Sequence, residues 1–303
     1  YNSELNEWSA GDEAVNKSRL NNSTEYRKLP EILKQNYGED LTKQIITTYM
    51  SYLLKVAVNY SNGKLIKNVL VTLNEVTPEM IELITTSFTN LGYNANDIKI
   101  ISHSESFVYY VLNQGKDIWI NQVYFLNFDR NDFSCRKLNV IKGKQVHVAD
   151  VTVEDLNDRM TYDSVKNNMD MADEIVADYM EDQLKKNVVS GVFLSGEGFY
   201  AEGWAKTLQT ICRNRRVFKG NNLIVKGAVY AAKEFFYMKT LKDYIISCKG
   251  RTRVRVTMSV KHKERDSMVT LSDIGDYWYQ AKSKTECIME EPTEAVFEIH
   301  NIM

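Results

Sequence analysis

The pattern of apolar and polar positions predicts a long helix and then a strand in the first part of the chain. Between positions 41 and 57, apolar residues recur at intervals of three and four, which is typical of an amphipathic helix running from 38–40 to about Asn59. The continuous apolar run at 68–73 then predicts a buried strand. The polar stretch before this helix, 1–36, predicts no comparable element.

The next segment repeats the alternation of helix and strand. Thr77 and Pro78 predict a helix start, because Thr is a good N-cap and Pro fits the first helical position. Gly92 is a natural C-cap for that helix. Positions 98–101 predict a second strand, and positions 104–112 a second helix.

A β-hairpin is predicted after these elements. Apolar stretches at 123–127 and 136–141 flank the turn-forming residues at 129–132. The polar stretch that follows, 155–187, is predicted to be helical.

A second α/β pattern extends over 188–238. It contains a short apolar strand at 192–194, a helix with Trp204, and a helix start rich in small residues at 227–232. The chain therefore carries the α/β pattern twice, which predicts sheets covered by helices.

The spacing of apolar residues changes at about residue 241. Positions 251–258 and 295–299 alternate with period two, which predicts strands with one polar and one apolar face. This β-rich tail is too short to close a sandwich alone.

Composition narrows the class of protein. A chain of 303 residues has room for two domains, and its formal net charge of −2 lacks the surplus of Lys and Arg that nucleic acids or anionic membranes attract. The four cysteines and four histidines are scattered, which predicts no metal site and a reducing, cytoplasmic setting. No apolar run approaches the roughly 20 residues that span a bilayer.

Three segments, in order, resemble the ATPase domain of seventy-kilodalton heat-shock chaperones and, more distantly, actin. They are the strand–helix–strand at 69–102, the hairpin at 123–140, and Ser195-Gly196-Glu197-Gly198 after its strand, followed by 222–228. The stretch 8–14 also resembles the segment downstream of that family's first phosphate loop. The resemblance identifies the chain as a divergent bacterial member of the actin-like ATPase superfamily.

This resemblance implies a fold and its boundaries. The fold is the actin-like, ribonuclease H-like arrangement of two duplicated α/β domains around a cleft. The strands that begin the first domain, with its first phosphate loop, are not found in the sequence from Tyr1 onward: either they lie upstream of Tyr1 or the protein lacks them. Residues 1–145 would form the first domain and the start of the second. Residues 146–240 would form the rest of the second domain, with a short helical lobe at about 150–187. Residues 241–303 would form a β-rich tail that resembles the start of the chaperones' peptide-binding domain.

The second phosphate loop of the family aligns with 129–134. By resemblance, Asp129 would orient the metal-bound water, and Asn131 and Ser134 would contact phosphate. The family's three glycines are here Asn131, Asp132 and Phe133, and two like charges about 4 Å apart cost about 4 kcal/mol at an intermediate dielectric. A plain β-turn explains the same residues, since Asn and Asp are good turn formers.

The residues at the position of the family's adenosine motif match that motif more closely than 129–134 match the phosphate loop. Gly196 and Gly198 would let a ribose or adenine face approach the backbone, and Glu197 could accept a bond from a ribose hydroxyl. A tight strand-to-helix turn without ligand is the alternative. Gly227 is expected to serve close packing first and nucleotide contact second.

The remaining candidates are acids and bases at element ends. Glu105 is the acid near the family's catalytic position, whereas His103 is better explained as a cap or surface residue. Arg213, Arg215, Arg216 and Lys219 are expected at a helix end, where cations favour the dipole. For Arg251, Arg253 and Arg255, a solvated strand edge is favoured over a site for an acidic partner.

Three functions compete at this level. The leading hypothesis is a degenerate ATPase that binds nucleotide weakly or not at all and acts as an interaction or regulatory protein. The second is a working ATPase using ATP or ADP with Mg²⁺, in which Asp129 and Glu105 act in catalysis. The third is a module that binds a protein or peptide partner through the β-rich tail.

Overall fold

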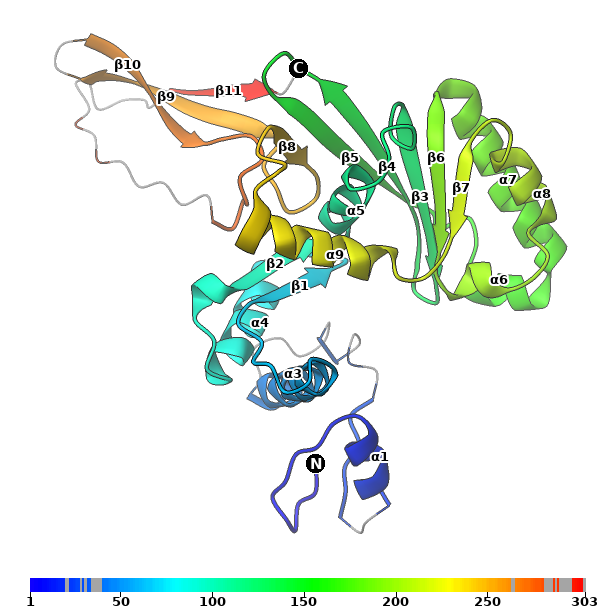
Figure 1. Ribbon diagram of the computed structural model, residues 1–303, viewed down its shortest axis with the longest axis vertical. Helices are drawn as coiled ribbons and strands as arrows, with labels where there is room; N and C mark the ends of the chain where they lie inside the picture. The colour runs from blue at the N-terminus through cyan, green and yellow to red at the C-terminus, as the bar shows by residue number, and fades with distance from the viewer. Residues whose placement is uncertain are drawn as a thin grey trace. The chain divides into compact units, whose positions relative to one another are not determined.

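The computed structural model describes residues 1–19, 22–27, 29, 32–33, 40–262, 265–280, 286, 288 and 296–301. The chain divides into two compact units, which span residues 1–100 and 101–303 (Figure 1). The domain boundaries predicted after residues 145 and 240 stay predictions.

The first unit is built on two helices and a two-stranded sheet. Its core contains Ile46 from the long helix, Leu83 and Phe88 from the next helix, and Ile98 and Ile100 from the second strand. Its elements are α1 (Asp12–Lys17), α3 (Asp40–Tyr60), β1 (Val69–Leu73), α4 (Pro78–Asn90), η1 (Ala95–Asp97) and β2 (Ile98–Ser102), which runs on into the second unit.

The predicted boundaries of α4 are confirmed at the level of hydrogen bonds. Thr77 Oγ1 accepts a bond from the backbone N–H of Met80 at 3.3 Å, and Pro78 is the first helical residue. Gly92 has φ 92°, a left-handed conformation that glycine adopts without steric strain. The predicted start of α3 at 38–39 lies outside the described residues, and the helix is described from Asp40.

The second unit carries most of the strands. Its elements are α5 (His103–Leu112), β3 (Gln122–Asp129), β4 (Asp132–Lys142), β5 (His147–Asp155), α6 (Tyr162–Asn167), α7 (Met169–Lys186), β6 (Val189–Ser195), η2 (Glu197–Tyr200), α8 (Ala205–Ile211), β7 (Arg216–Lys219), α9 (Leu223–Lys233), the π-helical turn η3 (Glu234–Met238), β8 (Tyr244–Ser247), β9 (Val254–His262), β10 (Arg265–Ser272) and β11 (Phe297–Asn301).

Among the described residues, six strands form a mixed sheet in the order β7-β6-β3-β4-β5-β8. Strands β3, β4 and β5 are antiparallel neighbours. Strand β6 joins β3 in parallel, β7 joins β6 in parallel, and β8 joins β5 in parallel. The α/β class is therefore confirmed. The strands β5, β7 and β8 were not predicted, and the polar stretch predicted as helix from 155 is helical from Tyr162 onward.

Helices cover both faces of this sheet. On one face, Val176 and Met180 of α7 and Ile211 of α8 pack with Tyr124 and Leu126 of β3 in a fully buried core. On the other face, α5 contributes Phe107, whose ring centroid lies 5.3 Å from that of Phe125. Helix α9 packs on α5. The result is a three-layer arrangement, because each apolar face of the sheet needs a cover.

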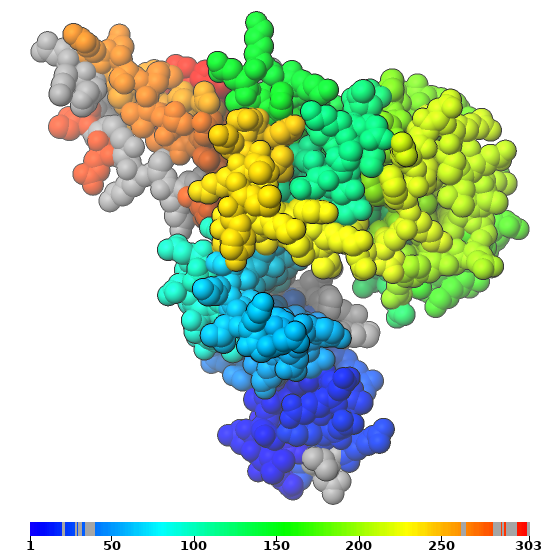
Figure 2. All heavy atoms as spheres, viewed as in Figure 1, coloured from blue at the N-terminus to red at the C-terminus, as the bar shows by residue number. Residues whose placement is uncertain are grey.

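A small antiparallel sheet follows, in the order β10-β9-β11 (Figure 2, orange and red). Met258 of β9 faces Val269 and Phe297, and Val256 faces Ile299, so apolar residues share one side of this C-terminal sheet. The strands predicted at 251–258 and 295–299 are confirmed from Val254 and from Phe297 onward; position 295 lies outside the described residues, and β10 was not predicted.

Candidate functional site

The turn between β3 and β4 was the predicted second phosphate loop. Asp129 pairs with Asp132 at the end of the ladder, so Arg130 and Asn131 alone form the connection. Asn127 Nδ2 donates to Asp129 Oδ2 at 3.1 Å and to Asp132 Oδ2 at 3.0 Å. The amide thereby holds two carboxylates beside a tight hairpin turn.

The predicted adenosine motif lies beside this turn. Ser195, the last residue of β6, pairs with Asn127 of β3, and the chain then passes through Gly196 at φ 100°. The backbone N–H of Glu197 donates to Asp129 Oδ1 at 2.9 Å. Arg130 Nε donates to Glu197 Oε2 at 3.0 Å, an exposed ion pair that lowers the pKa of Glu197 through its hydrogen bond. The two loops thus bond directly to each other.

The two glycines of the motif face the protein interior. A Cβ on Gly196 would collide with the backbone of Phe128, and a Cβ on Gly198 would collide with the Phe128 ring. That ring is fully buried and meets the ring of Phe199 at 5.9 Å and that of Trp204 at 6.3 Å. Close packing on β3 accounts for both glycines.

Ser134 lies further from the turn, on the same face of the sheet as Asn127 and Asp132. It pairs with Asn127 across the hairpin, and its Oγ accepts a bond from Arg136 Nη1 at 2.9 Å. Arg136 is 3% exposed, and burial lowers its pKa. It also pairs with the carboxylate of Asp132, at 3.9 Å. A buried cation therefore lies behind the acidic turn, a feature that no sequence motif indicated.

The structure gathers most of the predicted site residues but not all of them. Asp129, Asn131, Gly196, Glu197 and Gly198 lie around the two loops, with Asn131 exposed in the turn.

Gly227 and Glu105 lie elsewhere. Gly227 belongs to α9, where a Cβ would collide with the carbonyl oxygen of Ser106 in α5, so close helix packing explains it. Glu105 lies in the first turn of α5 and is 1% exposed. Ser102 Oγ caps that helix by accepting the N–H of Glu105 at 3.1 Å, beside His103 at the first helical position.

The carboxylate of Glu105 has two partners from the C-terminal part of the chain. Its Oε1 accepts from Arg251 Nη2 and, at 2.8 Å, from the hydroxyl of Tyr277. The Arg251 guanidinium lies over the Tyr277 ring, with 4.1 Å from Cζ to the ring centroid. Sequence reasoning could not find this cluster, because Glu105 lies 146 positions from Arg251 and 172 from Tyr277, and no motif joins them.

The prediction of a solvated edge for the three alternating arginines is wrong for Arg251 and for the position of the strand, because β9 lies between β10 and β11; Arg253 and Arg255 stay about half exposed. Arg251 precedes β9 and is 13% exposed in its ion pair with Glu105. Arg253 Nη2 donates to the Val151 carbonyl at 2.6 Å, and Arg255 pairs with Asp273 at 2.8 Å. The period-two pattern identified a strand, but each guanidinium finds a partner across the chain.

The basic cluster at 213–219 is also placed differently from the prediction. Helix α8 ends at Ile211, and Arg216 and Lys219 belong to the edge strand β7. Arg216 pairs with Asp117 at 3.0 Å, both side chains being exposed. Cations along an exposed edge discourage pairing with another strand, so charge protects β7 instead of complementing a helix dipole.

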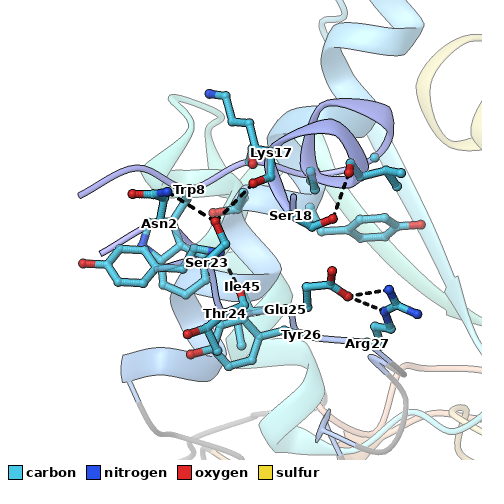
Figure 3. Close-up of a pocket in the computed structure, with 18 of the residues that line it drawn as sticks. Asn2, Trp8, Lys17, Ser18, Ser23, Thr24, Glu25, Tyr26, Arg27 and Ile45 are labelled. Atoms are coloured by element: carbon cyan, nitrogen blue, oxygen red, sulfur yellow. Dashed lines mark hydrogen bonds and ion pairs between the residues drawn. The ribbon is translucent and has the colours of Figure 1, made fainter. Parts of the chain in front are cut away.

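The first unit contains a cavity of about 460 Å³. Trp8 and Tyr26 line it and stack with ring centroids 5.6 Å apart, and Glu25 and Arg27 form an ion pair at its wall (Figure 3). The stretch singled out at 8–14 contributes to this lining. In the part of the chain that the structure describes, no three His, Cys, Asp or Glu side chains are arranged to hold a metal ion.

By its fold the chain is a mixed α/β protein with a six-stranded mixed sheet and a small antiparallel sheet near its C-terminal end. Residues 1–249 match the family described as "Family of unknown function (DUF5716) C-terminal", and the chain belongs to this family. No curated protein matches it. None of the described helices is both long enough and apolar enough to cross a membrane.

Proposed function

We propose that this chain uses an actin-like, ribonuclease H-like fold as an interaction or regulatory scaffold and does not hydrolyse ATP. The connectivity of the second unit supports the fold. A half of an actin-like fold is expected to begin with three antiparallel strands, extended beside the first by two parallel strands, each reached through helices. Strands β3, β4 and β5 form such a meander, and β6 and β7 extend it beside β3 after α7 and α8.

The main observation in support of an inactive ATPase is the bonding between the β3–β4 turn and the loop that follows β6. By resemblance to the chaperone ATPases, Asp129 would orient a metal-bound water. Here its Oδ1 accepts a hydrogen bond from the Glu197 N–H, and its Oδ2 accepts one from Asn127. The Arg130–Glu197 ion pair joins the same two loops. The groups that would turn toward a nucleotide are therefore bonded to one another.

Charge and shape make these loops a poor fit for a triphosphate. Asp129, Asp132 and Glu197 bring three carboxylates to the turn, where the cations beside them are the exposed Arg130, the buried Arg136 and Lys166, which acts on Glu197. Like charges repel the anionic phosphates. Gly196 and Gly198, which would let backbone approach a ligand, are filled on the inner side by Phe128. We therefore derive no step of catalysis through bound ATP.

The test is calorimetric titration of the intact protein with ATP and with ADP, with and without Mg²⁺, accompanied by a turnover assay. We expect no saturable binding at millimolar nucleotide and no turnover. Micromolar, Mg²⁺-dependent binding with turnover that Asp129→Asn abolishes would overturn the proposal in favour of a working ATPase.

A matched variant sharpens this test. Arg130→Ala/Glu197→Ala breaks the exposed ion pair but leaves the Phe128 core intact. If the ion pair between the loops alone prevented binding, this variant would bind ATP, since it leaves the bond from the Glu197 N–H to Asp129 in place. We expect it to remain inert, because Asp129 and Asp132 still repel phosphate.

A further inference from the structure

The Glu105 cluster is the most deeply buried ion pair among the described residues of the second unit. Glu105 is 1% exposed and Arg251 13% exposed. Burial on its own would lower the pKa of Arg251, but the charge of Glu105 outweighs it and the pKa is raised. Removing one member of such a pair leaves a buried, uncompensated charge, which is strongly destabilising.

The cluster also joins two backbone segments of the C-terminal part. Arg251 forms an isolated bridge with Tyr277, and Arg251 Nη1 donates to the Gly275 carbonyl at 2.6 Å. The N–H of Thr252 donates to the Asp276 carbonyl at 2.8 Å. These segments lead directly into β9 and out of β10, so they form the root of the C-terminal sheet.

Among the described residues, other contacts between this sheet and the six-stranded sheet are partly exposed to water. Arg253, which is 47% exposed, pairs with Asp150 at 3.5 Å and donates to the Val151 carbonyl. Next to it lies a cavity of about 190 Å³, lined by Val148 and Ile245 on one side and by residues of the C-terminal sheet on the other. A cavity in place of packed side chains contributes no dispersion energy there.

We propose that Glu105, Arg251 and Tyr277 form a latch that holds the C-terminal three-stranded sheet, and that opening the latch releases this sheet while the six-stranded sheet stays folded. A region held by one buried ion pair and few apolar contacts opens at lower free energy than a packed core. The latch thus makes the C-terminal sheet a separate cooperative unit.

The position of Glu105 gives the latch an input. Glu105 lies in the first turn of α5, directly after Ser102 ends β2. The carboxylate therefore moves with the β2–α5 junction, and a change at that junction breaks or restores the bonds to Arg251 and Tyr277. The fold in this way couples one strand–helix junction to the release of the C-terminal sheet.

The test is native hydrogen exchange of the full chain, read by mass spectrometry, for Glu105→Gln and Arg251→Met. We expect exchange at 248–262 and 265–280 to rise at least tenfold, with β3 and β6 unchanged. The double variant should exchange no faster than either single variant, because it leaves no unpaired charge. Additive effects, or equal acceleration in β3 and β6, would overturn the proposal.

Arg255→Met is the matched control, because it breaks an ion pair with Asp273 in the same region whose side chains are about half exposed. We expect less than a threefold change, and an effect equal to that of Arg251→Met contradicts the latch. If the single variants fail to fold, Tyr277→Phe decides. It removes one hydroxyl and keeps the ring under the guanidinium. A change of a few-fold confined to the C-terminal sheet supports the latch, and no change or a global change refutes it.

Discussion

Phe128 in the six-stranded sheet has none of its surface exposed, whereas Phe297 in the C-terminal sheet has 52% exposed. The contrast extends to their surroundings. Phe128 lies among the rings of Phe133, Phe199 and Trp204, while Phe297 faces Met258 at an edge strand whose five residues are all exposed. One sheet is stabilised by apolar burial, and the other depends on its root.

The comparison shows how one α/β chain can contain regions of unequal stability. The six-stranded sheet has helices on both faces, so its strands lose nearly all contact with water. The C-terminal sheet has half-exposed strands and polar bonds at its base. Apolar burial is distributed over many residues, whereas an ion pair concentrates its effect in two side chains. A region held by an ion pair is therefore easier to release by a single local change.

The largest expected difference comes from truncating the two phenylalanines. Phe128→Ala should lower the free energy of unfolding by about 4 kcal/mol, because it removes a fully buried ring and leaves a cavity. Phe297→Ala should cost less than about 1 kcal/mol, since half of its surface is already in water. Urea denaturation measures both values, and comparable losses would remove the contrast between the sheets.

The next largest expected loss of stability comes from disturbing the close contact between α5 and α9. Gly227→Ala should destabilise the protein by about 2 kcal/mol, because the added methyl collides with the backbone of Ser106 and backbone cannot give way cheaply. Gly220→Ala is the control, with no heavy atom within 4 Å of the added Cβ and an expected change within about 0.5 kcal/mol. Thermal or urea unfolding distinguishes them, and a neutral Gly227→Ala would mean that the helices separate freely.

Thiol labelling compares the two regions without disturbing either core. Burial raises the pKa of Cys135 and of Cys248 to about 12, so both thiols react only after opening. Cys135 lies in the core of the six-stranded sheet, whereas Cys248 lies beside Ser102 at the root of the C-terminal sheet. In variants that retain one of these thiols, we expect Cys248 to label at least tenfold faster, a difference of about 1.4 kcal/mol in opening.

The exposed Cys212 supplies the upper limit of that labelling scale. Cys287 lies outside the described residues and is replaced in every labelling variant. Equal rates for Cys135 and Cys248 would mean that both sheets open together, which would count against separate stabilities.

The smallest expected effect concerns a polar network inside the six-stranded region. Burial raises the pKa of Glu154, but bonds from Lys137 at 2.7 Å and Tyr179 at 2.8 Å outweigh it, and the pKa is lowered from 4.5. A lowered carboxyl pKa adds stability above pH 4.5 that is lost as pH falls through the folded value. Glu154→Gln should cost about 1 kcal/mol at pH 7, after allowance for partial exposure, and less at pH 3.

Urea denaturation at the two pH values checks this expectation. Glu181→Gln is a control, since its pair with Lys185 is exposed on α7. A loss for Glu154→Gln that is the same at pH 7 and pH 3 would show that the network acts through shape and not through charge.

Much of the architecture followed from sequence because local rules are strong where they apply. Thr77, Pro78 and Gly92 bound α4 through capping and backbone preferences that need no tertiary partner. The hairpin around 129–132 followed from turn-forming residues between two apolar runs. The strand β5 was missed because its valines, Val148 on one side and Val151 and Val153 on the other, do not keep a single period-two phase.

The candidate site divides in the same way. By itself, the sequence determined most of the helices, several of the strands and the two loops that carry Asp129 and Gly196, because each depends on neighbouring residues. Only the tertiary structure decided that Glu197 bonds to Asp129 and that Arg251 pairs with Glu105 instead of facing water. Periodicity says which side of a strand a residue occupies, but a charged side chain takes the partner that the folded chain brings within reach.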